Sequence, residues 1–110
     1  MKRLITTAML VLIFVSQEAF ATTIDNVWYK DKVKSVYPLG DGDFIVIFEK
    51  ENSCTGTYFY IEEGINGVTE KAMPNYLSVV LTAAASGKAL SVYYDKNDPK
   101  CHVNRLLVDF

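Results

Sequence analysis

The chain has 110 residues, half of them hydrophobic, and a formal net charge of −2 at pH 7. This length suits one domain built around one hydrophobic core. A mildly acidic chain has no overall field that would attract nucleic-acid phosphates or anionic lipid headgroups, so we expect neither nucleic acid nor membrane as a partner of the mature protein.

The first segment, residues 1–21, reads as a cleavable secretion signal. Two basic residues precede an uncharged, mainly apolar run over residues 4–15, and the Ala-Phe-Ala of residues 19–21 fits the small-x-small pattern before a cleavage site. The alternative, an uncleaved membrane anchor, needs about 20 apolar residues, and this run is shorter. The sequence therefore predicts a secreted or periplasmic protein with one mature domain, residues 22–110, of net charge −3.

Three strands are predicted in the first half of the mature chain. Residues 27–39 are rich in strand-forming side chains and end at a Pro-Leu-Gly-Asp-Gly turn. Residues 44–48 are an unbroken β-branched and aromatic run, which is typical of a strand buried on both faces. Residues 54–61 then predict a strand with Tyr58 and Tyr60 on one face.

One helix is predicted after a charged, glycine-containing connection. Pro74 suits its first turn, and Gly87 is the residue best able to adopt the left-handed conformation that ends it. The expected buried stripe has helical spacing: Leu77, Val80, Leu81 and Ala84. Two strands follow, at residues 89–94 and 101–108, with a polar turn between them.

The predicted order of elements is β-β-β-α-β-β. Five strands with one helix between the third and the fourth is the order of the OB-fold, a small closed or nearly closed antiparallel barrel plugged by its helix. We therefore expect a mainly β, OB-fold-like five-stranded antiparallel barrel over residues 22–110. The alternative is an open antiparallel sheet with the helix packed on one face.

Two cysteines, Cys54 and Cys101, lie in the predicted mature part. In an exported chain an even pair is most simply one disulfide, here between the start of the third strand and the last strand. A metal thiolate or a catalytic thiol would need partner ligands. The one histidine, His102, directly follows Cys101, and adjacent residues on a strand point to opposite faces. We therefore interpret His102 as an ordinary strand residue.

No catalytic or metal-binding constellation emerges from the polar residues. With one histidine, neither a zinc site of the usual ligand spacing nor a Ser-His-Asp triad can be assembled from the sequence. The acidic residues outside the strands are interpreted as solvated, although a hydrolase with paired carboxylates stays as a minor alternative: Asp41, Asp43, Glu62, Glu63 and Glu70. We expect a protein that is not an enzyme and that uses no metal or cofactor.

Aromatic residues are the one compositional excess, with seven tyrosines and one tryptophan, all after residue 21. These side chains combine rigid apolar area with a polar tip, so they are favoured at binding surfaces. The alternative is that they pack the core or lie on ordinary surface. Four of them are the candidate ligand-binding residues: Trp28, Tyr58, Tyr60 and Tyr93.

The second half of the chain carries a family resemblance. Residues 76–95, with the Ser-Gly-Lys that ends the helix and the Leu-Ser-Val-Tyr-Tyr strand, are similar to part of bacterial AB5 toxin B subunits, especially the subtilase-cytotoxin and pertussis-like branch, and to small exported bacterial proteins. Cys54, the Ala-Ala-Ser-Gly-Lys of residues 84–88 and Cys101 match the same pattern, and the likeness extends loosely over residues 24–110. The resemblance implies an OB-fold and, for the toxin branch, a pentamer that binds cell-surface glycans.

Together these features predict a non-catalytic exported binding module, alone or as a homo-oligomer, for an extracytoplasmic glycan or protein. The alternative is a small monomeric periplasmic inhibitor or envelope-interaction protein.

Overall fold

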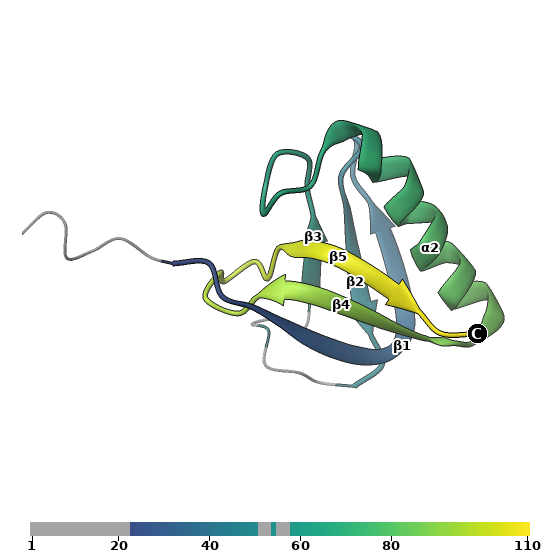
Figure 1. Cartoon of the computed structure of the whole chain (residues 1–110). Helices are drawn as coiled ribbons and strands as arrows, with labels where there is room; N and C mark the ends of the chain where they lie inside the picture. The colour runs from purple at the N-terminus through teal and green to yellow at the C-terminus, as the bar shows by residue number, and fades with distance from the viewer. Residues whose placement is uncertain (1–22, 51–53, 55–57) are drawn as a thin grey trace, which may run out of the picture.

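The computed structural model describes residues 23–50, 54 and 58–110 (Figure 1). The predicted secretion signal, residues 1–21, lies outside the described residues, as does the part of the third predicted strand at residues 55–57. No helix in the described part of the chain is long and apolar enough to cross a membrane.

The described residues form a mainly β structure with one α-helix, in the predicted order β-β-β-α-β-β. A single 3-10 turn, η3 (Glu70–Ala72), leads into the helix. The elements are β1 (Asn26–Pro38), β2 (Phe44–Phe48), β3 (Tyr58–Ile61), α2 (Met73–Ser86), β4 (Ala89–Asp95) and β5 (Val103–Val108).

All five strands pair antiparallel in one sheet of order β3-β2-β1-β4-β5. β1 serves both halves of this sheet: residues 26–32 pair with β4, and residues 33–38 pair with β2, with a register shift between Val33 and Ser35. Figure 1 shows β1 curving from one half to the other. The sheet is open, because its two edge strands, β3 and β5, are not hydrogen-bonded to each other. The predicted barrel is therefore not closed in the described part of the chain.

Side chains and loops connect the two edges where a strand ladder would close a barrel. We call this region the β3–β5 seam. The predicted disulfide is present there, with the Cα atoms of Cys54 and Cys101 6.0 Å apart. Beside it, the side-chain amide of Asn66 donates a 2.9 Å hydrogen bond to the carbonyl of His102, and that of Asn104 donates a 2.6 Å bond to the carbonyl of Asn66.

The core lies between the inner face of the curved sheet and α2, which packs mainly against β1 and β5. Its centre is a cluster of rings around Phe59, which contacts Tyr29, Phe48 and Tyr94 with ring centroids 4.8–5.6 Å apart. The prediction that β2 is buried on both faces is confirmed: four of its five residues are buried.

α2 turns a different face inward from the one predicted. Leu81 is 49% exposed and Ala84 is exposed, so the expected stripe was wrong at both positions. The inward face begins one turn earlier and recurs at helical spacing: Met73, Tyr76, Leu77, Val80 and Ala83. Leu77 and Val80 belong to both stripes, which is why the spacing alone did not decide between them.

The end of α2 was predicted correctly. Gly87 has φ +69°, and its N–H donates to the carbonyl of Ala84 while the N–H of Lys88 donates to that of Ala83. This is the hydrogen-bond pattern of a Schellman motif, which satisfies carbonyls that the helix leaves unpaired. It turns the chain directly into β4.

Candidate functional site

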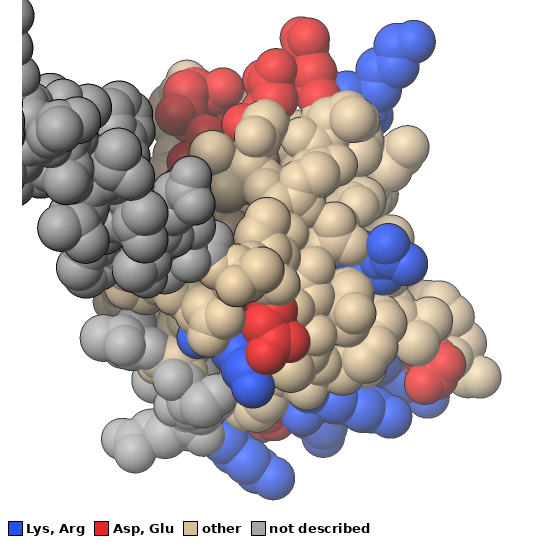
Figure 2. Space-filling view, turned by 60° about the vertical axis from the view of Figure 1, so that its left-hand side comes forward, with Lys and Arg blue, Asp and Glu red and all other residues tan. Residues whose placement is uncertain are grey.

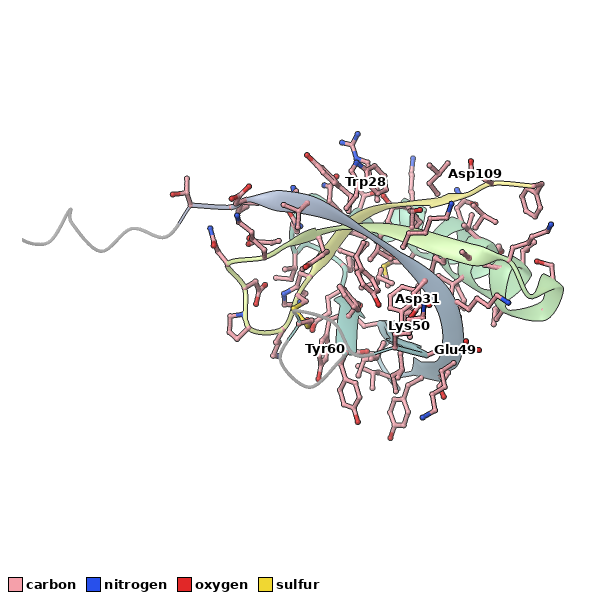
Figure 3. All side chains as sticks on the ribbon, turned by 90° about the horizontal axis from the view of Figure 1, so that it is seen from below. Trp28, Asp31, Glu49, Lys50, Tyr60 and Asp109 are labelled. Carbon is pink, nitrogen blue, oxygen red and sulfur yellow. A yellow bond between two sulfur atoms is a disulfide. The ribbon has the colours of Figure 1, made fainter. Side chains whose placement is uncertain are left out.

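Two aromatic side chains meet on the outer face of β1 and β4. Trp28 and Tyr93 are directly opposite each other in the β1–β4 register, and their ring centroids lie 4.9 Å apart. Residues alternate between the two faces of a strand, so Tyr29 points into the core while Trp28 points outward. Trp28 is 52% exposed, and Figure 3 shows its side chain pointing away from the fold. The pair forms an open aromatic surface.

Arg105 extends this surface onto β5. It is opposite Tyr93 in the β4–β5 register, and its guanidinium carbon lies 5.4 Å from the centre of the Tyr93 ring. Its Nε donates a 2.8 Å hydrogen bond to the side-chain oxygen of Asn104, which orients the guanidinium. We call Trp28, Tyr93 and Arg105 the aromatic platform. Sequence reasoning missed Arg105, because its place beside Tyr93 depends on strand register.

A second cross-strand row lies beside the platform on the same outer face. Lys30 is opposite Ser91 on β4, and Ser91 is opposite Leu107 on β5. The ammonium of Lys30 lies 3.9 Å from a carboxylate oxygen of Asp109, and both side chains are well exposed. An exposed pair at this distance contributes little to stability, so Lys30 is available to another anion.

The far end of this face is hollowed. Lys30, Lys32 and Lys50 line a hollow of about 450 Å³ together with Asp31, Glu49 and Ala89, and we call it the lysine hollow. These lysines come from two parts of the chain: two lie on β1, and Lys50 follows β2. The hollow continues the row of Lys30 past the bend of β1.

Asp31 holds the two backbone segments that form the lysine hollow in place relative to each other. Its carboxylate accepts hydrogen bonds from the backbone N–H of Lys32 at 2.7 Å, the N–H of Lys50 at 2.8 Å and the hydroxyl of Tyr29 at 3.2 Å. Burial acts to raise the pKa of Asp31, but these hydrogen bonds and the charge of Lys50 outweigh it, so its pKa lies below the ordinary value of 3.8. Figure 3 shows Asp31 pointing inward, toward Lys50.

The other two candidate ligand residues lie on a different face. Tyr58 and Tyr60 are on the outer face of β3, opposite Ile47 and Ile45 of β2. Tyr58 is 44% exposed, whereas Tyr60 is half-buried under Lys100, whose ammonium lies 5.4 Å from the ring centre. Figure 3 shows Trp28 and Tyr60 on opposite sides of the molecule. The four candidates therefore form two surfaces, not one.

His102 is not the strand residue that the sequence suggested. Cys101 has φ +49° and β5 begins only at Val103, so the opposite-face argument does not apply to His102. Its ring is buried in the β3–β5 seam, where Nδ1 is hydrogen-bonded to Asp98. Nε2 lies 3.1 Å from a carboxylate oxygen of Glu62, although the two atoms are not aligned for a hydrogen bond.

This cluster ties two loops together. Glu62 follows β3, and Asp98 lies in the turn between β4 and β5. Partial burial acts to raise the pKa of Asp98, but hydrogen bonds with the His102 ring and the N–H of Lys100 outweigh it, so its pKa lies below the ordinary value of 3.8. The buried His102 ring and the two partly exposed carboxylates thus link the two loops at the seam.

Four of the five acidic residues considered in the sequence converge on one surface. These four line one hollow of about 420 Å³ with Met73, Pro74 and Leu77: Asp41, Asp43, Glu63 and Glu70. None of the four is buried. Among the described residues, no group of three or more His, Cys, Asp or Glu side chains is arranged to hold a metal ion.

Comparison with known proteins gives no family for the chain. No protein-family model matches it, and no curated protein matches its sequence. The case for a function therefore rests on the geometry of the surfaces described above.

Proposed function

We propose that this protein is a non-catalytic exported binding module that recognises carbohydrate through the aromatic platform. The observation that carries the proposal is the Trp28–Tyr93 pair, two large rings in contact with each other on an outer face of the sheet. In the described part of the chain, three other large rings, those of Tyr29, Phe48 and Tyr94, pack around Phe59 in or against the core. Leaving an apolar side chain exposed forgoes about 25 cal/mol per Å² of burial, so the exposed Trp28 ring beside a half-buried Tyr93 ring indicates a partner.

The chemistry of the platform suits a sugar. The C–H face of a sugar ring is apolar and packs on an aromatic ring, while its hydroxyls need hydrogen-bonding groups at the rim. Arg105 supplies donors directly beside Tyr93. The platform lies on paired strands, so its residues are held in place before a ligand arrives, which lowers the entropy cost of binding.

The architecture supports assignment to the OB-fold class as part of the same proposal. The order β3-β2-β1-β4-β5 is that of an OB barrel opened between its third and fifth strands, with the helix between β3 and β4. The disulfide in the β3–β5 seam is compatible with an oxidising, extracytoplasmic location. A likeness to AB5 toxin B subunits adds a pentamer to the proposal, and light scattering on the purified protein would distinguish a pentamer from a monomer.

A glycan array tests the proposed function. We expect the oxidised mature protein to bind a subset of glycans and the Trp28→Ala variant to lose that binding. Tyr37→Ala is the matched control, because Tyr37 is at least as exposed as Trp28, at 59%, but lies beside Ile45 on the other outer face. Absence of binding across a broad panel, or equal loss in both variants, would refute a role for the platform.

A protein partner is the second candidate, and it is supported by the face that carries Tyr58. Tyr37, Ile45, Ile47 and Tyr58 line a hollow of about 290 Å³ on the outer side of β1, β2 and β3. An apolar surface rimmed by tyrosines is typical of protein interfaces. A pull-down from periplasmic extract that loses a stoichiometric partner on Tyr58→Ala, but not on Trp28→Ala, would favour an inhibitor or envelope-interaction protein.

A further inference from the structure

Charged side chains are unevenly distributed on the surface of this molecule. Figure 2 shows a group of acidic side chains at the top and most of the visible Lys and Arg side chains toward the bottom, with single side chains of the other sign in each region. The acidic hollow is lined by residues of the β1–β2 turn, the loop after β3 and η3, whereas the lysine hollow lies at the bend of β1. The lysines of this hollow, Lys30, Lys32 and Lys50, come from two separate parts of the chain, and the fold brings them together. The residues that line the lysine hollow, three lysines with Asp31 and Glu49, therefore carry a formal charge opposite in sign to that of the chain.

The lysine hollow and the aromatic platform are continuous. Trp28, Lys30 and Lys32 alternate along β1, so all three point to its outer face. Two residues of a strand span roughly 6.7 Å, so this strip runs about 13 Å from Trp28 to Lys32. Lys50 adds a further positive charge at its end, and Arg105 adds one beside Tyr93.

The negative charges in this region compete weakly with an incoming anion. The carboxylate of Asp31 is turned inward and occupied by its three donors. Asp109 contacts Lys30 only at 3.9 Å in an exposed pair. Glu49 is the other acidic residue that lines the hollow. Lys30, Lys32, Lys50 and Arg105 therefore present an excess of positive charge to solvent.

We infer that the outer face of β1, β4 and β5 binds an acidic polysaccharide, a linear glycan with carboxylate or sulfate groups repeated along its chain. This inference rests on the proposed function and names its ligand class. One sugar packs on Trp28 and Tyr93, and the anionic groups of the following sugars pair with Lys30, Lys32 and Lys50. Charge complementarity along the strip selects a repeated anion over a neutral glycan.

The arrangement of the rings favours a polysaccharide over single-stranded nucleic acid. Single strands are bound by aromatic side chains that each take a successive base. Here the two rings contact each other at 4.9 Å, so they offer one combined surface and leave no gap for a base between them. The lysines beyond Trp28 follow one another with no further ring among the residues that line the hollow.

The test is a titration of the oxidised mature protein with heparin, dextran and a single-stranded oligonucleotide. We expect heparin to bind, the affinity to fall as salt is raised, and dextran to bind at least tenfold more weakly. The Lys30→Ala/Lys32→Ala double variant should lose at least tenfold in heparin affinity, and Trp28→Ala a similar amount. The control is Lys71→Ala/Lys96→Ala, which removes the same charge from exposed positions elsewhere.

Each other outcome overturns the inference. Dextran binding that depends on Trp28 but not on Lys30 and Lys32 would leave the proposed function standing and remove the acidic ligand. Equal losses in the two lysine double variants would mean that heparin senses only the overall charge. Tighter binding of the oligonucleotide would favour nucleic acid. No binding of heparin, dextran or any arrayed glycan would remove the proposed function as well.

Discussion

Reduction of the disulfide should destabilise this domain more than any single contact that it contains. Cys54 and Cys101 are 47 positions apart and join the two edges of an open sheet. For a loop of this length the chain-entropy model gives about 4 kcal/mol of stabilisation through the unfolded state. In a domain of this size 1 kcal/mol shifts the Tm by roughly 4–8 °C, so reduction should lower the Tm by roughly 16–32 °C.

The assay is thermal unfolding followed by circular dichroism, with and without reductant. The control is the Cys54→Ser/Cys101→Ser double variant, which should match the reduced protein to within about 1 kcal/mol and should not respond to reductant. A loss below about 1 kcal/mol in the reduced protein would refute the reasoning. It would mean that the hydrogen bonds of the seam, such as that from Asn66 to His102, already hold the edges together in the unfolded ensemble.

Asp31→Asn should cost about 2 kcal/mol near neutral pH, because its amide nitrogen cannot accept the N–H of Lys50. Folding lowers the pKa of Asp31, so the stability that its carboxylate contributes is complete above the ordinary value of 3.8 and is lost as pH falls through the folded value. Urea unfolding from pH 7 to 2 should therefore show the unfolding free energies of the variant and the native protein converging at low pH. A difference in unfolding free energy that stays constant with pH would contradict this. Val80→Ala should cost roughly 2 kcal/mol and Leu81→Ala under about 0.5 kcal/mol, because Val80 is fully buried and Leu81 is half-exposed. A lower urea midpoint for Leu81→Ala than for Val80→Ala would instead support the predicted buried stripe that includes Leu81. Gly87→Ala should cost about 1 kcal/mol through its positive φ alone, since an added Cβ meets nothing within 4 Å; a loss above about 3 kcal/mol in the same assay would indicate a steric role.

Local features of the sequence were sufficient to predict the strands and the helix of the fold. The apolar run from Phe44 to Phe48 is a strand over the predicted residues, because five β-branched or aromatic residues fit no short helix. Gly87 ended the helix as expected, because few other residues adopt its conformation without strain. The disulfide followed from the number of cysteines. Each of these depends on a few neighbouring residues.

Features that depend on strand register were not accessible in this way. The platform exists because Trp28 faces Tyr93, 65 positions later, and no local pattern specifies that pairing. The absence of pairing between β3 and β5 could not be predicted for the same reason, because it too is a matter of strand register. The link between Glu62 and His102 was missed because it needs the left-handed turn at Cys101, a conformation unusual for cysteine. One signal was present: the alternation of Trp28, Lys30 and Lys32 placed them on one face.

Because β1 pairs with both β2 and β4, the two halves of the sheet can be completed only one after the other. As the chain is made from its N-terminus, residues 33–38 meet β2 across one short turn, but Lys32 must wait 57 residues for its partner, Ala89. During that interval the first half of β1 is an unpaired strand edge, the kind of surface that recruits other unfinished chains. Lysines on such an edge discourage that pairing. Lys30 and Lys32 are therefore expected to discourage such pairing until β4 has been made.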